Sequence, residues 1–238
     1  MSQERNTFHY NTSWEKIARV FPKGEKLTIL DIGCGDGRIV QHLTNIHTVH
    51  GLDTSGAAVA AARRAGIDAE RVDLNQPMPY KDETFDIVLA LDVLEHLTDV
   101  KGRLAECKRV MKHDGYLIIS IPNHFDLRTR IDVMRGKGII KWSQRMYETE
   151  PEVYSHIRFW TLSEFSSMLR GLDFYPDLWQ FNFMSQGLLP TDLIQASLRR
   201  WLVKNFPNAW SGKFVVRCRK TEPDTAKQII IDRTPTDF

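Results

Sequence analysis

The chain has 238 residues, of which 42% are hydrophobic and 26% charged, with a formal net charge of +2. This composition is typical of a globular α/β protein and excludes a disordered, fibrous or disulfide-stapled chain. The near-balance of charge provides no field that would favour nucleic acid or an anionic membrane. No apolar run approaches the roughly 18 residues of a membrane-spanning helix. Three widely spaced cysteines without an export signal indicate a cytoplasmic protein with reduced thiols.

Short apolar runs alternate with helical stretches through the first half of the chain, a pattern that predicts βαβ units and a mostly parallel sheet. The predicted strands span 27–32, 47–52, 68–73, 85–91, 115–121, 173–182 and 213–219. The predicted helices span 11–21, 37–44, 55–65, 101–112 and 191–204, and a further helix begins with capping-box spacing at Thr161. The last helix is expected to pack on the sheet through apolar residues that include Leu198 and Trp201.

The chain is expected to divide into three parts. Residues 1–26 form an N-terminal helical cap, 27–220 form the α/β domain, and 221–238 form a C-terminal tail. Within the domain, 124–160 is rich in basic and aromatic residues and breaks the alternation, so we interpret it as an inserted lid after the fifth strand. The tail is predicted to be mobile, although Ile229–Ile231 could pair with another strand.

The most informative stretch is 29–37 (ILDIGCGDG), which predicts a strand running into a glycine turn. Its three glycines let the backbone turn sharply and approach a ligand. A dinucleotide would need the third glycine one residue later and a positive potential for its pyrophosphate. Asp31 and Asp36 instead favour a ligand with cationic groups, such as the ammonium and sulfonium of S-adenosylmethionine (SAM).

Two further acids are predicted at the ends of the next two strands. Asp53 lies 20 residues after Gly33, where a carboxylate can accept hydrogen bonds from ribose hydroxyls. Asp73, followed by Leu74, could accept from the adenine amine. Each acid alone is better explained as an ordinary turn residue. Because the carboxyl ends of parallel strands meet at one edge, these acids and Asp31 together indicate a nucleoside ligand.

Three segments resemble class I SAM-dependent methyltransferases: DIGCGDG at 31–37, DETFDIVLALDVLEHL at 82–97 and RVMKHDGYLIISIPN at 109–123. The continuation at 122–138 and 155–165 is similar to the branch that contains MetW. The resemblance implies a Rossmann-like, seven-stranded sheet with one antiparallel strand at its edge, and SAM lying across the glycine loop. The cofactor-binding residues it implies are Tyr10, Asp31, Gly33, Cys34, Gly35, Asp36, Gly37, Asp53, Thr54, Asp73, Leu74 and Leu91.

Methyl transfer from a sulfonium is an in-line displacement, so the protein mainly positions the nucleophile and needs a base only when the nucleophile is protonated. Three histidines could serve as that base: His96, His124 and His156. His96 has the strongest claim because it follows the fourth strand, although a histidine that satisfies a helix start would look the same. We therefore expect His96 and His156 to be the catalytic residues.

The same region resembles a known metal-binding set. Asp92, Glu95 and His96, with His156 further along, resemble the metal ligands of small-RNA 2′-O-methyltransferases, with Asp92 in place of a glutamate. Some ubiquinone-biosynthesis O-methyltransferases share this outline. On a helix the first three would share one face, and the set could bind a divalent ion. Because the first ligand is shortened and a Glu-His pair is common in this family, we expect no metal.

These observations predict an enzyme that transfers a methyl group from SAM to a small molecule, at oxygen rather than at nitrogen or carbon. One alternative is an accessory protein of the MetW type that binds a partner acyltransferase in methionine biosynthesis. Another is a metal-dependent RNA 2′-O-methyltransferase, which the nearly neutral charge disfavours. The expected partner is a small-molecule acceptor, with no nucleic acid and no membrane span, and a homodimer stays open.

Overall fold

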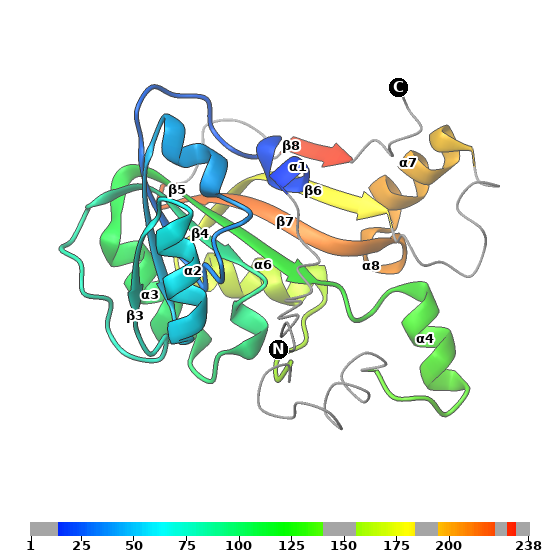
Figure 1. Ribbon diagram of the computed structural model, residues 1–238. Helices are drawn as coiled ribbons and strands as arrows, with labels where there is room; N and C mark the ends of the chain where they lie inside the picture. Colours follow the sequence, from blue (N-terminus) through cyan, green and yellow to red (C-terminus); the bar gives the residue numbers. More distant parts are fainter. Residues whose placement is uncertain (1–13, 140–155, 184–194, 222–227, 232–238) are drawn as a thin grey trace, which may run out of the picture.

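The computed structural model describes residues 14–139, 156–183, 195–221 and 228–231 (Figure 1). Their strands form one eight-stranded sheet in the order β3-β2-β1-β4-β5-β7-β6-β8. The strands are β1 (Thr28–Ile32), β2 (Thr48–Asp53), β3 (Asp68–Arg71), β4 (Phe85–Leu91), β5 (Met111–Pro122), β6 (Tyr175–Phe183), β7 (Ser211–Arg219) and β8 (Gln228–Ile231). All seven predicted strands are confirmed, and β8 is additional.

Strand β7 is antiparallel to both of its neighbours, β5 and β6. The expected antiparallel strand therefore lies inside the sheet, and its predicted position at the edge is wrong. The reason is burial: Phe214, Val215 and Val216 are all fully buried, and side chains that point alternately to both faces need cover on each side.

The end of the chain also differs from expectation. Strand β8 pairs in parallel with β6, so the prediction of a mobile tail is wrong for 228–231. The alternative that Ile229–Ile231 pairs with another strand is confirmed. An isoleucine run has high β-propensity, and β6 offers an unpaired edge to receive it.

The helices are α1 (Trp14–Ala18), α2 (Gly56–Arg64), α3 (Val100–Val110), α4 (Leu127–Met134), α6 (Leu162–Gly171), α7 (Ala196–Asn205) and α8 (Pro207–Trp210), with short 3₁₀ helices η1 (Gln41–Asn45) and η2 (Leu94–His96). The capping box at Thr161 is confirmed, with Glu164 as its partner. The α-helix predicted over 37–44 is wrong, because a turn and η1 follow the glycine loop, where β-branched Ile39 and Val40 disfavour a helix.

The helix α7 packs with a face other than the predicted one. Leu198 and Trp201 are about half exposed, whereas Arg199 and Val203 are buried. The apolar side chains of this helix are distributed around its circumference, so the choice of buried face depends on the neighbouring β6 and not on the helix itself.

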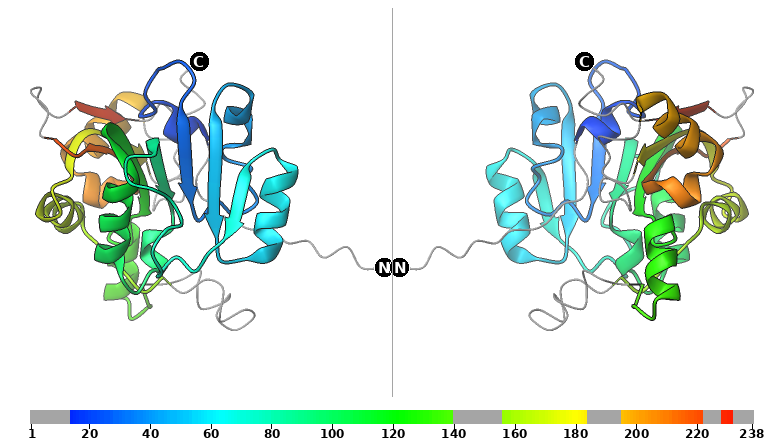
Figure 2. Two further views of the ribbon diagram at one scale, coloured as in Figure 1. Left: turned by 90° about the vertical axis from the view of Figure 1, so that its left-hand side faces the viewer. Right: turned by 90° about the vertical axis from the view of Figure 1, so that its right-hand side faces the viewer.

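The sheet is covered on both faces, and α2 and α3 lie on opposite sides of it (Figure 2). Alternate residues of β4 divide between two buried clusters: Leu89 packs with α1 and α2, whereas Val88 packs with α3 and α6. Burial on both faces confirms β4 as a central strand. Among the residues described, no helix is long and apolar enough to cross a membrane.

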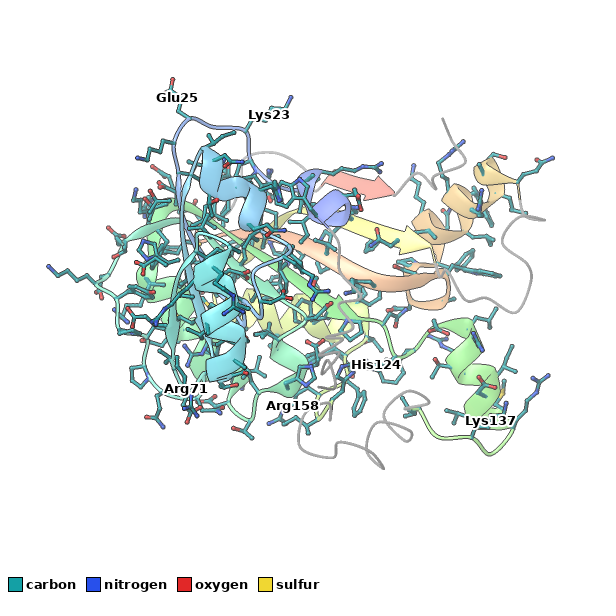
Figure 3. All side chains as sticks on the ribbon, in the orientation of Figure 1. Lys23, Glu25, Arg71, His124, Lys137 and Arg158 are labelled. Atoms are coloured by element: carbon teal, nitrogen blue, oxygen red, sulfur yellow. The ribbon has the colours of Figure 1, made fainter. Side chains whose placement is uncertain are left out.

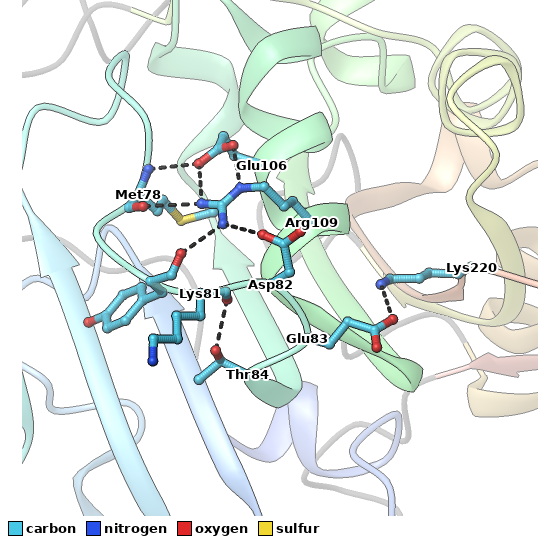
Figure 4. Close-up of polar contacts among 9 residues, drawn as sticks. Met78, Lys81, Asp82, Glu83, Thr84, Glu106, Arg109 and Lys220 are labelled. Atoms are coloured by element: carbon cyan, nitrogen blue, oxygen red, sulfur yellow. Dashed lines mark hydrogen bonds and ion pairs between the residues drawn. The ribbon is translucent and has the colours of Figure 1, made fainter.

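The crossover from β3 to β4 is fixed by Arg109 of α3 (Figure 4). Its guanidinium donates to the backbone oxygens of Met78 and Tyr80, at 3.1 and 2.7 Å, and to the carboxylates of Asp82 and Glu106. The bond with Arg109 lowers the pKa of the Glu106 carboxyl to about 2. This network lies in the connection that leads into β4, so it stabilises the position of β4. The candidate site described below begins at the carboxyl end of that strand.

Candidate functional site

The glycine loop between β1 and η1 depends on the absence of side chains. Gly33, Gly35 and Gly37 have φ values of 70°, 55° and 79°, which favour glycine. A Cβ at Gly33 would lie 2.0 Å from Cγ2 of Val93, and one at Gly37 would lie 2.3 Å from Cδ1 of Ile67. The loop therefore packs directly against the segment that follows β4.

Asp53 at the end of β2 holds this loop. One carboxylate oxygen accepts from the backbone N–H of Gly35, and the other accepts from that of Ser55, both at 2.8 Å. The side chain of Ser55 in turn caps α2. A carboxylate fixed by two N–H donors still has lone pairs left for further hydrogen bonds. The ribose role of Asp53 stays a prediction.

Asp31 lies within β1, and its side chain is 3% exposed. Burial, and then the nearby charge of Asp53, raise the pKa of its carboxyl to about 8. A cation placed beside Asp31 would favour the ionised form and lower this pKa. The neighbouring Cys34 packs against Gly51, and burial raises the pKa of its thiol.

The other expected cofactor residues have mixed surroundings. Asp73 is exposed and lies two residues beyond β3, where it accepts from the backbone and side chain of Asn75. Asp36 pairs with Arg38, Leu74 and Leu91 are buried, and the carbonyl of Thr54 accepts from Arg71. Tyr10 lies outside the described residues.

A second polar group begins where β4 ends, at Asp92. This residue has a φ of 55°, in the left-handed region that aspartate tolerates better than most residues. Its carboxylate accepts from the Ser120 hydroxyl at 2.8 Å and contacts the ammonium of Lys213. Asp92 therefore precedes η2 and points to β5 and β7, so the prediction that it shares a helical face with Glu95 and His96 is wrong.

Glu95 and three histidines converge beside this group. Nε2 of His156 lies 4.0 Å from Oε1 of Glu95, and the rings of His96 and His156 are 4.8 Å apart. His156 is brought there because the backbone N–H groups of Ile157 and Arg158 donate to the Glu95 carbonyl. Its Nδ1 is 2.7 Å from Nε2 of His124.

The electrostatics of this cluster are unusual. The Glu95 side chain is buried, and both of its carboxyl oxygens lack a hydrogen-bond partner. Burial and, to a smaller extent, the nearby charge of Asp92 raise the pKa of this carboxyl well above its ordinary range. Burial, with the charge of His96, lowers the pKa of both His124 and His156 to about 4. These two imidazoles are therefore neutral near pH 7. Their low pKa makes them weak proton acceptors, whereas a neutral ring nitrogen can bind a cation. His124, a member of the cluster, and Arg158, which is bonded to the Glu95 carbonyl, are labelled in Figure 3.

Three of the four residues that resemble a known metal-binding set meet. One ligand atom each from Glu95, His96 and His156 lies within 4.8 Å of the others. The Glu95 carboxyl, which has no hydrogen-bond partner, fits a cation. The far nitrogen of His156 is held by the His124 imidazole, in the place where ligating histidines usually bond to a carboxylate, a backbone carbonyl or water. The fourth residue, Asp92, is engaged by Lys213 and Ser120 instead. The contributions of Lys213 and of the His124–His156 pair were not expected from the sequence.

Comparisons with known proteins place the chain among methyltransferases. Residues 30–119 match the family described as methyltransferase domain. A ubiquinone biosynthesis O-methyltransferase of Rhodopseudomonas palustris strain TIE-1 is 29% identical over 184 residues, which cover 71% of each chain. A protein with the same name from strain HaA2 is 33% identical over 129 residues, which cover 50% of this chain and 49% of the relative.

Solved structures support the fold. A SAM-dependent methyltransferase of Thermotoga maritima, described as a possible histamine N-methyltransferase, has a TM-score of 0.62 at 20% identity and covers 89% of both chains. One from Mesorhizobium loti has a TM-score of 0.60 at 21% identity and covers 87% of this chain and 96% of its own. The matched family and the glycine loop together show that residues 30–119 form a SAM-dependent methyltransferase domain, and the sheet has the fold of such enzymes.

Proposed function

We propose that this enzyme methylates a hydroxyl oxygen of a small molecule. The observation that carries the proposal is the buried Glu95 carboxyl, whose two oxygens lack a hydrogen-bond partner, beside His156 and His96. An amine presents its lone pair directly, whereas a hydroxyl must lose a proton as it attacks, so a proton-accepting group favours an oxygen acceptor. The name of the relatives supports the same reaction.

In the proposed reaction SAM lies across Gly33–Gly37, with its ribose on Asp53 and its cationic end towards Asp31. The acceptor oxygen attacks the methyl carbon in line, and the carbon–sulfur electron pair leaves with sulfur as a neutral thioether. The acceptor proton passes to the cluster, where His96 and His156 are the proposed catalytic residues. Thr54, Leu74 and Leu91 would flank the nucleoside, with Asp73 at its adenine.

A divalent cation is a second candidate at the same cluster, and the specific observation that favours it is again the partnerless Glu95 carboxylate. Glu95, His96 and His156 would hold the ion. When bound, it would supply a Lewis acid that lowers the pKa of an acceptor hydroxyl. Transfer assays with added EDTA and with added Mg²⁺ separate the two versions of the site.

We further propose that the acceptor is a hydroxylated aromatic precursor of a quinone, as the names of the relatives suggest. The lid expected over 124–160 stays a proposal, because residues 140–155 lie outside the described part of the chain. Its described end at residues 157–158 is bonded to Glu95. A cytoplasmic location agrees with three buried free cysteines. The accessory and RNA-directed alternatives are not favoured by these relatives.

The deciding experiment combines calorimetry with SAM and S-adenosylhomocysteine and transfer assays on phenols, matched anilines and sugars. We expect both nucleosides to bind and phenols to be methylated in preference to anilines. Tight SAM binding with transfer only to the anilines would contradict the oxygen assignment. If neither nucleoside binds, the assigned cofactor site is wrong.

A further inference from the structure

Two buried amides lie at the carboxyl end of β6, outside the site described above. Gln180 is fully buried and Asn182 is 6% exposed. They share one face of the strand with Leu178, whereas Trp179 and Phe181 point into the opposite cluster. Both amides therefore face the side of the sheet that carries the glycine loop and α1.

The two amides satisfy only part of each other's hydrogen-bonding capacity. Nε2 of Gln180 donates to Oδ1 of Asn182 at 3.3 Å, while Oε1 of Gln180 and Nδ2 of Asn182 are buried without a partner. Exchanging oxygen and nitrogen in both amides leaves the same result, one acceptor and one donor unused. Their neighbours on this face, Leu178 and Val215, show that apolar side chains fit there. Unpaired buried amides are costly, so their presence points to a bound partner.

The strand register connects these amides to the end of β4. Asn182 lies opposite Lys213, and Gln180 lies opposite Val215, which in turn lies opposite Ser120. Since Lys213 and Ser120 both contact Asp92, a polar strip runs from Asp92 to Gln180. With about 4.8 Å between neighbouring strands, the axes of β4 and β6 lie roughly 14 Å apart. The amides are therefore too distant to touch the reacting oxygen.

We propose that Gln180 and Asn182 bind the non-reacting end of the methyl acceptor, and that this end carries a second, neutral hydroxyl. A hydroxyl donates one hydrogen bond and accepts another, which matches the unused acceptor and donor. A carboxylate or phosphate would face the amide oxygen with no proton to offer. The ammonium of Lys213 is already compensated by Asp92, so the strip offers no net positive charge to an anion. This inference rests on the proposed function and names its acceptor class more closely.

The test compares two probes that differ by one distal hydroxyl, 4,4′-dihydroxybiphenyl and 4-hydroxybiphenyl. Their dissociation constants are measured in the presence of S-adenosylhomocysteine, so no methyl transfer is needed. We expect the wild-type protein to bind the dihydroxy compound about tenfold more tightly. In Gln180→Leu and in Asn182→Leu this preference should disappear, while the affinity for S-adenosylhomocysteine and the unfolding temperature are maintained or rise.

The matched control is Gln41→Leu, which removes an exposed amide on η1 and should keep the tenfold preference. Equal affinity of the wild-type protein for the two probes, or no binding of either, would overturn the inference. A preference that survives in both leucine variants would do the same. The proposed function is judged separately, from the transfer of a methyl group to a phenol in the calorimetry and transfer experiment.

Discussion

The cofactor end and the acceptor end of the site differ in how their polar groups are hydrogen-bonded. At the cofactor end, formed by the glycine loop and β2, the polar groups are already bonded to the backbone: Asp53 accepts from Gly35 and Ser55 before any ligand arrives. The acceptor end is formed by the carboxyl ends of β4, β5 and β6 and by the amino end of β7. There Glu95, Gln180 and Asn182 keep buried polar atoms without a hydrogen-bond partner. The first end is preorganised, whereas the second holds hydrogen-bonding capacity in reserve for its ligand.

The largest effect is expected at the acceptor end. His96→Gln should lower kcat by a factor of about 10²–10⁴, because a base that takes the acceptor proton is lost. The dissociation constant of SAM should stay unchanged, since His96 lies outside the glycine loop. Steady-state kinetics and calorimetry check both values, with the exposed His113→Gln as the control. If His96→Gln weakens SAM binding by the same factor as it lowers kcat, the variant does not separate acceptor chemistry from cofactor binding, and the prediction is wrong.

At the cofactor end, Asp53→Ala should weaken SAM binding by about 1–3 kcal/mol. The change removes the ribose acceptor and also releases the N–H groups of Gly35 and Ser55. Asp73→Ala is the matched comparison, and we expect a smaller loss because Asp73 is exposed. Calorimetric titration of both variants gives the answer, and unchanged affinity in Asp53→Ala would refute its assigned role.

Acid should destabilise the acceptor end selectively. The folded protein holds His124 and His156 neutral until the pH falls to about 4, whereas unfolded histidines take up protons near their ordinary pKa of 6.5. Stability should therefore fall as the pH drops from 6.5 to 4, by roughly 2 kcal/mol for the pair after allowance for solvent near His156. Urea unfolding of the wild type and of a double His→Phe variant across this range measures the difference. Parallel curves would contradict the lowered pKa values.

Asp31 should show the opposite dependence on pH. Its folded pKa of about 8 lies above the ordinary 3.8, so folding takes up a proton between these values and stability falls as the pH rises. Asp31→Asn should raise the unfolding free energy by up to about 5 kcal/mol at pH 9, with little change at pH 4, and should weaken SAM binding. A stability difference that is independent of pH would mean that Asp31 ionises normally.

The cofactor end was largely predictable from the sequence because its determinants are local. The glycines and Asp31 fall within nine residues, and Asp53 follows at the spacing of one βαβ unit. Helix capping at Thr161 is likewise encoded within one turn. By contrast, the position of β7 depends on its pairing with β5 and β6, which are distant in the sequence.

The acceptor end was less predictable because its contacts join residues far apart in the chain. Lys213 meets Asp92 across 121 positions, and His124 meets His156 across 32. No periodicity or motif connects such positions. The alternating pattern around Gln180 shows that it points to one face of a strand, but only the register of β5, β7 and β6 places that face beside Asp92.

The strand at the chain terminus has a consequence for the protein in solution. Without β8, the row of peptide groups along β6 would be open to a strand from another molecule, and such contacts begin aggregation. Strand β8 covers this row with only four residues, Gln228–Ile231, and a strand so short offers a poor template for further growth. Strand β8 therefore covers the edge of β6, the strand that carries the two buried amides.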